Sequence, residues 1–381
     1  MKRKVTYVTG TRADYGLFSE ALKRIRENPQ FELGVIVTGM HLESQFGMTV
    51  SEVEADGMPI VARVPNLESG DTGAAQARSV GRALLGITDA LVKFQPDVLI
   101  VLGDRGEMLA GAAAAVHLDI AVAHVHGGEV SGTVDELVRH AITKLSHVHL
   151  TATEDAAQRV TKMGERRENV HVVGATGLDY LRRFEPIPPA EISRDVGFDV
   201  TRPFVIFTQH PVTGELAEAP AQMEASLRAL EGTRLQVVAT YPNSDAGGRS
   251  MIEVLKEWKG DWLHVFPSLG QRKFATLLKE TKAIVGNSSS GIIEAPFFGV
   301  PAVNVGTRQA GRLRAGNVLD VGYDSAAIRE GIDCAVNDEA FRGRVLEAPS
   351  PYGDGHAGER IVELLGSLQL GPELLNKRIA Y

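Results

Sequence analysis

The sequence lacks three things that whole classes of protein need: cysteine, a long apolar run and an excess of positive charge. Its only cysteine is Cys334, so the chain can form neither an internal disulfide framework nor a cysteine-bound metal cluster. That fits a reducing compartment, and we expect a cytoplasmic protein. No apolar stretch approaches the ~18 residues of a membrane span. Because the basic N-terminus runs straight into a strand-like segment, we predict no signal peptide either.

The charge balance is acidic, with a formal net charge of −8. This argues against a nucleic-acid-binding protein, although it leaves room for local basic sites that bind phosphate. What the chain does have is apolar material, since 44% of its residues are hydrophobic, enough to build sizeable cores. Its 381 residues correspond to one to three globular domains.

Strand-like apolar runs alternate with helical patterns along almost the whole chain. Repeated β-then-α order predicts an α/β fold with parallel sheets covered by helices on both faces. A segment with three prolines and many charges, residues 183–202, interrupts the alternation, and we place a domain boundary there. We expect one domain over residues 1–182 and a second over 183–357. By fold analogy, the helical segment 358–381 should return to the first domain.

Acidic and basic side chains gather where two successive predicted strands end. The run 97–102 ends in Gly-Asp-Arg, the run 120–125 ends in His-Gly-Gly-Glu, and a polar segment follows. Ligands of open α/β sheets bind at the carboxyl ends of the strands. A histidine, carboxylates and arginines in one crevice suggest proton transfer on an anionic substrate. The candidates are Asp104, Arg105, His126, Glu129, Asp135 and Arg139.

Several of these candidates also have a purely structural interpretation. Asp104, beside Arg105, could stay ionised and act as a base, or it could cap the following helix. Of Asp135 and Glu136, one could cap the next helix while the other faces the crevice.

The first predicted strand, residues 5–9, ends in GTRADYG. This is not the GxGxxG of dinucleotide-binding proteins, so a dinucleotide fingerprint is absent. Such a first crossover still often holds phosphate at its helix N-terminus. Arg12 could contact phosphate or a uracil, or it could be a surface turn residue. We count Asp14 with it as a candidate binding residue.

A second candidate site follows the strands of the C-terminal half. GNSSSG, residues 286–291, follows one predicted strand, and residues 292–298 open a helix. Glycines let the backbone approach a ligand, and serine hydroxyls with free helix N–H groups suit a diphosphate, although an ordinary helix cap would look the same. The candidates in this motif are Gly286, Asn287, Ser288, Ser289 and Ser290.

Three further residues of this half could complete the site. Glu294 suits the two hydroxyls of a ribose, or it is a solvated helix residue. Arg308 could bind the diphosphate, or it belongs to a basic surface loop. His210 could donate a hydrogen bond to the leaving phosphate, or it is a structural histidine.

The pairs His124/His126 and His147/His149 each place two histidines on one face of a strand, which raises a metal-dependent hydrolase as an alternative. Metal sites of that class need further histidine and carboxylate ligands from several strands. Here the neighbouring residues are mainly glycine and arginine. We therefore expect no metal site.

Taken together, the motifs resemble those of a known family. The chain is similar to the hydrolysing UDP-N-acetylglucosamine 2-epimerases of the sialic- and legionaminic-acid pathways in GTRADYG, LGDRGEM, HVHGGEVSGTVDELVRHAITKLSH, TQHP, YPNSD and GNSSSGIIE with GTRQAGR. The resemblance spans residues 5–320. It implies a glycosyltransferase-B-like fold, with two Rossmann-like domains whose parallel sheets face a central cleft. It also implies a nucleotide-sugar substrate, a homodimer or homotetramer, no NAD or other cofactor, and no obligatory metal.

The resemblance implies a specific reaction as well. A carboxylate removes the weakly acidic C2 hydrogen of a 2-acetamido sugar while UDP leaves from C1, which gives a 2-acetamidoglucal. Arginines and a helix terminus stabilise the departing diphosphate. Protonation at C2 from the other face and addition of water at C1 then release an N-acetylmannosamine-type sugar.

By position, the resemblance assigns roles to residues. Asp104 and Asp135 match the family's catalytic carboxylates, and His210 matches the histidine near the diphosphate. Where the family often has a catalytic glutamate, this chain has His126, with Glu129 three residues on. Either His126 performs the proton transfer, with a pKa nearer neutrality, or Glu129 does. The nucleotide-site positions are matched by Arg12, Asn243, Ser288, Ser289, Glu294 and Arg308.

The expected substrate is UDP-N-acetylglucosamine. UDP-2,4-diacetamido-2,4,6-trideoxyglucose and a GDP-linked sugar are alternatives, and the histidine at position 126 is compatible with such a different sugar. A glycosyltransferase of the same fold would use an acceptor in place of water. A non-catalytic nucleotide-sugar sensor would bind without turnover, and the dense acid/base cluster argues against it.

Overall fold

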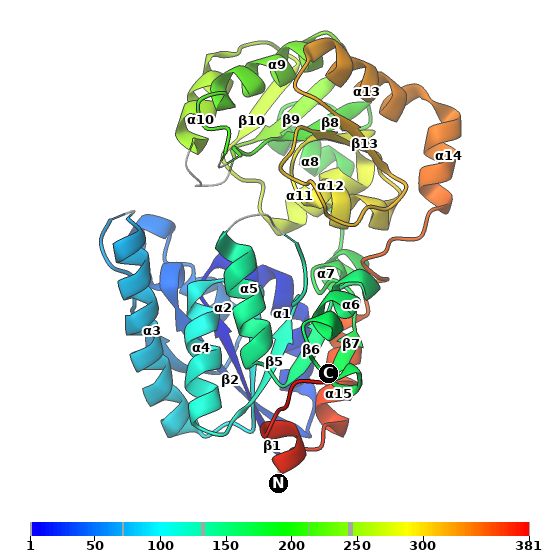
Figure 1. Cartoon of the computed structure of the whole chain (residues 1–381). Helices are drawn as coiled ribbons and strands as arrows, with labels where there is room; N and C mark the ends of the chain where they lie inside the picture. The colour runs from blue at the N-terminus through cyan, green and yellow to red at the C-terminus, as the bar shows by residue number, and fades with distance from the viewer. Residues whose placement is uncertain (1, 71, 131–133, 213, 243–246, 381) are drawn as a thin grey trace. The chain divides into compact units, whose positions relative to one another are not determined.

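A computed structural model of the chain describes residues 2–70, 72–130, 134–212, 214–242 and 247–380. The candidate Asn243 therefore lies outside the described residues. The chain forms two compact units, one of Met1–Tyr180 with Tyr352–Tyr381 and one of Leu181–Pro351. In Figure 1 the red C-terminal segment accordingly lies within the same unit as the blue N-terminal one.

The first unit is built on a seven-stranded sheet whose order is β3-β2-β1-β4-β5-β6-β7. Its described strand pairs are all parallel. The strands are β1 (Arg3–Thr9), β2 (Phe31–Thr38), β3 (Ile60–Val64), β4 (Val98–Leu102), β5 (Ala121–Val125), β6 (Val148–Thr151) and β7 (Val170–Val172). The α-helices are α1 (Arg12–Glu27), α2 (Val50–Ala55), α3 (Gly73–Phe94), α4 (Gly106–His117), α5 (Val134–Leu145), α6 (Glu154–Lys162), α7 (Leu178–Arg183, which runs into the second unit), α15 (Ala357–Ser367) and α16 (Pro372–Leu375). Short 3-10 turns are η1 (Gly39–Leu42), η2 (Ser44–Phe46) and η3 (Arg167–Asn169).

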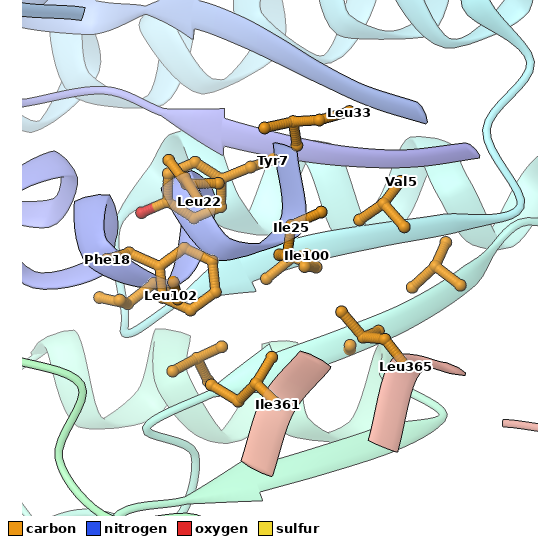
Figure 2. Close-up of a cluster of buried hydrophobic side chains, with 14 of the residues drawn as sticks. Val5, Tyr7, Phe18, Leu22, Ile25, Leu33, Ile100, Leu102, Ile361 and Leu365 are labelled. Carbon is orange, nitrogen blue, oxygen red and sulfur yellow. The ribbon is translucent and has the colours of Figure 1, made fainter. Parts of the chain in front are cut away.

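Apolar side chains project from both faces of this sheet, as a parallel sheet covered by helices requires. Along β1, Val5 and Tyr7 face one side and Val8 faces the other. The side with Tyr7 is covered by α1 and α15, and the opposite side by α3, α4 and α5. Figure 2 shows Ile361 and Leu365 of α15 in the same core as the side chains of β1, β4 and α1. The C-terminal helix is therefore part of the core of the first unit.

The second unit repeats the plan with a six-stranded sheet of order β10-β9-β8-β11-β12-β13, again with parallel pairs. Its strands are β8 (Phe204–Thr208), β9 (Gln236–Thr240), β10 (Leu263–Phe266), β11 (Ala283–Gly286), β12 (Ala302–Val305) and β13 (Val318–Val321). Its helices are α8 (Pro189–Val196), α9 (Ala219–Glu231), α10 (Gly248–Glu257), α11 (Gln271–Glu280), α12 (Ser290–Ile293), α13 (Ser325–Asn337) and α14 (Glu339–Glu347), with a 3-10 turn, η4 (Ala295–Phe298). One face packs on α9, α10 and α13, and the other on α8 and α11.

Many helices begin at a polar residue whose side chain accepts a hydrogen bond from an amide of the first turn, which satisfies a donor that the helix itself leaves unpaired. Thr72, Thr153, Asp324 and Asp338 cap α3, α6, α13 and α14 in this way. The predicted α/β class with parallel sheets is confirmed. None of the described helices is long and apolar enough to cross a membrane.

Candidate functional site

Each sheet has one point where the strand order reverses, and the candidate residues collect there. In the first sheet this point lies between β1 and β4, and in the second between β8 and β11. Because neighbouring strands are parallel, the loops after them leave the same edge of the sheet. Ligands of open α/β sheets bind at such points. GTRADYG and Gly103–Arg105 follow the first pair of strands, and His210 and GNSSSG follow the second pair.

Asp104 lies directly after β4 and is held by an arginine from α5. The Arg139 guanidinium donates hydrogen bonds to the Asp104 carboxylate and, at 2.9 Å, to the carbonyl oxygen of Glu129. Burial raises the pKa of Asp104, Arg139 opposes that shift, and Asp135 and Glu129 add to it. The cap residue of α4 is Arg105. Asp104 is therefore not the helix cap, and its carboxylate lies among the other candidate acids.

A buried histidine that we had considered only as a metal ligand supports the Asp104 turn. His124 Nε2 lies 2.8 Å from the carbonyl oxygen of Gly103, so this nitrogen carries the proton and donates it. Its Nδ1 lies 3.1 Å from the Thr143 hydroxyl of α5. Burial lowers the pKa of His124 to about 3, which keeps the ring neutral. His124 thus ties β5, α5 and the turn before Asp104 together.

His126 follows β5 in a left-handed backbone conformation, with φ +61°. The backbone N–H of Thr176 points to Nε2 of His126 at 3.3 Å. Because a backbone N–H can only donate, Nε2 accepts, and the ring proton of a neutral His126 sits on Nδ1. That nitrogen lies 3.9 Å from Oε1 of Glu129. The two candidates for the family's acid/base position are therefore neighbours, and both side chains are largely buried.

Helix α5 presents its candidates from its first two turns. Asp135 is exposed in the first turn, and Arg139 lies four residues further on, one helical turn along the same face. The other acid of that turn is Glu136. Its Oε1 lies 3.7 Å from Nε2 of His140, so Glu136 contacts a residue of the same helix. The structure therefore brings Asp104, Glu129, Asp135 and Arg139 together.

Asp14 has a different environment from the one expected for a binding residue. Its carboxylate accepts hydrogen bonds from the amides of Gly10 and Thr11, at 3.2 and 2.8 Å, and from the hydroxyls of Thr9 and Thr11. Thr11 in turn accepts from the Asp14 amide, which completes a capping box. Burial raises the pKa of Asp14 to about 6, although the hydroxyls of Thr9 and Thr11 pull it down. Asp14 holds the loop in shape.

Arg12 begins α1 within this loop motif, and Arg105, after β4, lies near Asp14. Arg12 is half-exposed and forms an ion pair with Glu52 at 3.0 Å. Arg105 pairs with the buried Glu107 at 3.3 Å. Burial would lower the pKa of Arg105, but Glu107 raises it and keeps the guanidinium charged. Glu107, which our sequence analysis missed, packs so closely that a Cβ on Gly39 would lie 2.7 Å from its carboxylate.

In the second unit, Asn287 joins the two loops at the point of reversal. Its side-chain oxygen accepts from the His210 amide at 2.6 Å, and its side-chain nitrogen donates to the His210 carbonyl at 2.9 Å. Gly286 precedes it with φ +117°, and a Cβ there would lie 2.1 Å from the carbonyl oxygen of Thr208. Only glycine fits this crossing. Asn287 is buried and holds the loops of His210 and GNSSSG together.

Arg308 reaches the same loop from beyond β12. Its guanidinium donates to the carbonyl oxygen of Asn287 at 3.2 Å, and Gln309 donates to that oxygen at 2.8 Å. Glu294 has its pKa raised by burial, partly offset by a hydrogen bond from Ser290. The structure thus brings His210, Arg308, Glu294 and the GNSSSG motif to one edge of the second sheet.

One expectation about this loop is wrong. Residues 292–298 do not form one helix, because α12 covers only Ser290–Ile293 and a separate 3-10 turn follows. Pro296 lacks an N–H and its ring prevents the helix from continuing. The amides of Ile292 and Ile293 already donate to the carbonyl oxygen of Ser289. Any anion at this loop therefore depends more on side chains than on the N-terminus of a long helix.

A family model described as UDP-N-acetylglucosamine 2-epimerase matches residues 23–366. The chain belongs to the UDP-N-acetylglucosamine 2-epimerase family. The same match shows that the chain is an enzyme of that family. One relative matches the chain over its full length. The resemblance inferred from the motifs is thereby confirmed.

Two relatives of this epimerase-family chain are particularly informative. It is 42% identical to the Legionella pneumophila UDP-N,N'-diacetylbacillosamine 2-epimerase (hydrolyzing), over 100% of both chains. It is 35% identical to the Neisseria meningitidis UDP-N-acetylglucosamine 2-epimerase, over 90% of this chain and 91% of that one. A crystal structure of UDP-GlcNAc 2-epimerase from Neisseria meningitidis bound to UDP-GlcNAc aligns with a TM-score of 0.81 at 20% identity, covering 95% of this chain and 99% of that one. That likeness confirms the expected glycosyltransferase-B-like fold.

Among the described residues of this family member, no group of three or more His, Cys, Asp or Glu side chains is arranged to hold a metal ion. The histidine pairs find other partners, His124 in the turn before Asp104 and His149 on Glu165 at 3.0 Å. The alternation of His124 and His126 at the end of β5 marked His124 in the sequence, but only as a possible metal ligand. Sequence patterns offered no signal for Thr176 or Gln309, whose positions depend on contacts distant in the chain.

Proposed function

We propose that this enzyme converts a UDP-linked 2-acetamido sugar into UDP and the free C2 epimer, with water added at C1. The observation that carries the proposal is the cluster around Asp104, in which a partly buried carboxylate is bound by Arg139 and lies near Asp135 and Glu129. Abstraction of a weakly acidic C–H needs a positioned base of raised basicity. Burial of a carboxylate supplies it.

In the proposed elimination, a carboxylate of this cluster takes the C2 proton as the C1–O bond breaks. The electron pair of the C2–H bond forms the C1–C2 double bond, and the pair of the C1–O bond leaves with UDP. The product is a 2-acetamidoglucal. Water then adds its oxygen to C1, and a proton reaches C2 from the opposite face. Asp104 and Asp135 are the proposed carboxylates for the first proton transfer, the removal of the C2 proton.

The pair His126 and Glu129 is proposed to serve the second proton transfer. In its neutral form His126 carries its proton on Nδ1, 3.9 Å from Glu129, because Thr176 donates to Nε2. The Nδ1–H of the neutral imidazole therefore lies on the side of Glu129. A neutral imidazole is too weak an acid to protonate a carboxylate, so in this proposal a protonated Glu129 gives the proton to C2 and His126 orients the Glu129 side chain.

The second unit is proposed to bind the nucleotide. Ser288 and Ser289 would contact the diphosphate through hydroxyls, with Arg308 supplying charge-assisted hydrogen bonds. Glu294 would accept from the ribose hydroxyls, and His210 would donate to the leaving phosphate. Asn287 supports this assignment indirectly, because it holds the loops of His210 and GNSSSG in contact.

Similarity to the relatives supports a diacetamido sugar as the donor. The relative at 42% identity over both full lengths is named for diacetylbacillosamine, whereas the relative named for N-acetylglucosamine is 35% identical. This difference favours UDP-2,4-diacetamido-2,4,6-trideoxyglucose over UDP-N-acetylglucosamine as the preferred donor. A relative from Campylobacter jejuni, 31% identical over 84% of both chains, is named for GDP- and UDP-linked forms, so a GDP donor belongs in the same test.

The deciding experiment is product analysis in D2O with each of these three donors. We expect release of the nucleoside diphosphate and a free sugar that carries deuterium at C2. A product that keeps its original hydrogen at C2, or no product with any of the donors, would reject the proposal. A glycosyltransferase would instead turn the donor over only with an acceptor and would retain the C2 hydrogen.

A further inference from the structure

The C-terminal end of α5 is held by a residue more than 230 positions away in the chain. Lys377 Nζ donates hydrogen bonds to the carbonyl oxygens of Lys144 and Ser146, at 2.6 and 2.7 Å, and to the Glu165 carboxylate at 2.9 Å. The three ammonium protons therefore each have an acceptor. A cation at the last carbonyls of a helix also compensates the negative end of its dipole.

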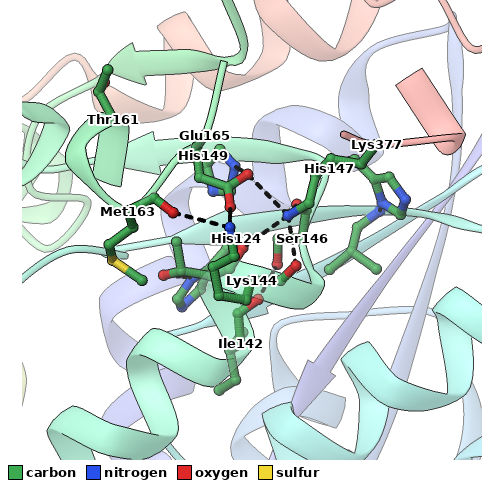
Figure 3. A network of polar contacts seen from close by, with 12 residues as sticks. His124, Ile142, Lys144, Ser146, His147, His149, Thr161, Met163, Glu165 and Lys377 are labelled. Carbon is green, nitrogen blue, oxygen red and sulfur yellow. Dashed lines mark hydrogen bonds and ion pairs between the residues drawn. The ribbon is translucent and has the colours of Figure 1, made fainter. Parts of the chain in front are cut away.

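Glu165 is the centre of this cluster, which is drawn in Figure 3. Its side chain is only 2% exposed and accepts hydrogen bonds from Lys144 at 2.6 Å and from His149 at 3.0 Å, besides that from Lys377. Burial alone would raise the pKa of Glu165, but these three donors lower it to about 2. The carboxylate therefore stays ionised, and His147 and His149 are the titratable rings beside it and Lys377.

The helix that Lys377 holds is the one that holds Asp104. Arg139 of α5 binds the Asp104 carboxylate, and Thr143 of α5 binds His124, which binds the carbonyl of Gly103. Arg139 lies five residues before Lys144 and seven before Ser146, within about two turns of the carbonyls that Lys377 binds. Because a short helix moves as a rigid body, displacement of its C-terminal end also displaces Arg139.

We propose that Lys377 is a positioning residue of this enzyme, which locks the C-terminal end of α5 so that Arg139 meets Asp104. The proposal rests on the proposed function for the role of Asp104 in turnover. The contact between Lys377 and the C-terminal end of α5 does not depend on the proposed function, and its effect on α5 can be measured without substrate. Figure 3 shows Lys377 directed from the C-terminal segment into the cluster at Glu165 and Ser146.

The test uses Lys377→Met in the full-length enzyme, with Arg378→Met as the control. Arg378 is the exposed cation next in the chain, so its removal changes the net charge equally. In Lys377→Met, we expect amide hydrogens of α5 to exchange roughly tenfold faster or more, because a buried charge-assisted contact is lost. Turnover should fall by roughly 10- to 100-fold through misplacement of the catalytic group, with an unchanged KM and an unchanged affinity for UDP.

A second readout separates positioning from mere stability. The charged groups near Asp104 include Arg139, Arg105, Asp135 and Glu129, and Arg139 lowers the pKa of Asp104. When α5 shifts, Arg139 withdraws, so the pKa of Asp104 should rise in Lys377→Met. Carbon NMR of labelled aspartate reads this pKa with or without turnover. Lys377→Arg, which keeps a cation and several donors, should restore most of the normal exchange, pKa and rate.

Unchanged exchange in α5 and an unchanged Asp104 pKa in Lys377→Met would overturn the proposal, even if the melting temperature falls. If Lys377→Met does not fold, Lys377→Gln keeps two donors for the carbonyls and is measured in the same way. If wild-type enzyme turns over none of the donors, the proposed function fails. The exchange and NMR measurements then still decide whether Lys377 positions Arg139 against Asp104.

Discussion

Asp104 has both basic and acidic neighbours, and their balance sets the strength of its carboxylate as a base. Burial raises its pKa most, Arg139 lowers it, and Asp135 and Glu129 raise it further. A buried carboxylate of raised pKa binds a proton more strongly than an exposed aspartate does. Removal of a carbon-bound proton needs that property.

Replacing Asp104 by asparagine removes the base but keeps the shape of the side chain. We expect turnover to fall by about 10²- to 10⁴-fold, the usual contribution of general acid–base catalysis. UDP affinity, measured by calorimetry, should stay the same because the proposed nucleotide site lies in the second unit. Asp135→Asn should behave alike, whereas Asp89→Asn, at an exposed position of α3, should leave the rate unchanged. Full activity of Asp104→Asn would remove this residue from the mechanism.

The contact of Arg139 with Asp104 predicts the direction in which the pH profile of kcat/KM shifts when Arg139 is replaced. The base works in its ionised form, so the rate is lost as the pH falls through the pKa of Asp104. Because Arg139 lowers that pKa, Arg139→Met should raise it and move the acid limb of kcat/KM to higher pH. A kcat/KM profile for this variant, beside Arg78→Met on the exposed side of α3, measures the shift. A move of the limb to lower pH would contradict the assignment.

Arg308 is the residue with which to test the proposed nucleotide site. Arg308→Ala should weaken UDP binding by about 1.5–3 kcal/mol, the typical contribution of a hydrogen bond to a charged group. Isothermal calorimetry gives this number directly. Arg202→Ala, an exposed arginine of the same unit, is the matched control. Equal UDP affinity in the Arg308 variant and the control would place Arg308 outside the site.

Among the elements, the loop between β11 and α12 shows why one position must be glycine. Gly286 has φ +117°, and a Cβ there would meet the Thr208 carbonyl at 2.1 Å. Any side chain must push β8 and β11 apart, which separates Asn287 from His210. The loop therefore depends on backbone proximity as much as on its serines.

Gly286→Ala should consequently abolish measurable UDP binding while the first unit keeps its fold. Hydrogen exchange should show lost protection in β8 and β11 and unchanged protection in β1 and β4. Gly214→Ala is the control, because a Cβ there meets nothing within 4 Å. Normal UDP affinity in Gly286→Ala would mean that UDP binding does not need the close approach of Gly286 to the carbonyl of Thr208.

At the scale of the whole molecule, the chain leaves the first unit, builds the second and returns. The return is stabilised by apolar packing, since Ile361 and Leu365 of α15 are fully buried in the core that α1 and the first sheet share (Figure 2). The segment that follows α16 then places Lys377 at the C-terminal carbonyls of α5. The first unit thus needs both ends of the chain.

Ile361→Ala should destabilise the first unit by about 2–5 kcal/mol, the cost of a buried Ile-to-Ala cavity. Denaturant unfolding followed by hydrogen exchange should assign the loss to β1, α1 and α15 and not to the second unit. Leu346→Ala on α14, 72% exposed, should be close to neutral. Equal loss of protection in both units would show that they do not unfold separately.

Much of the fold and part of the candidate site followed from local patterns. Alternating apolar runs and helical periods indicated parallel sheets, and the motifs at strand ends indicated where a site would form. The extent of α12 did not follow, because Pro296 stops a helix that the preceding motif only begins. Neither did the position of the Asp14 carboxylate, since its partners depend on how the loop after β1 closes.

By itself, the amino-acid sequence determined the class of fold, the family and the chemical groups available at each strand end. These depend on residue types and short spacings, which act within a few residues along the chain. Only the tertiary structure decided that Thr176 sets the tautomer of His126, that Asn287 binds the backbone of His210, and that Lys377 binds the C-terminal carbonyls of α5. The physical reason is that these hydrogen bonds join residues 50, 77 and 233 positions apart. Their geometry exists only once both sheets have formed and their covering elements have packed.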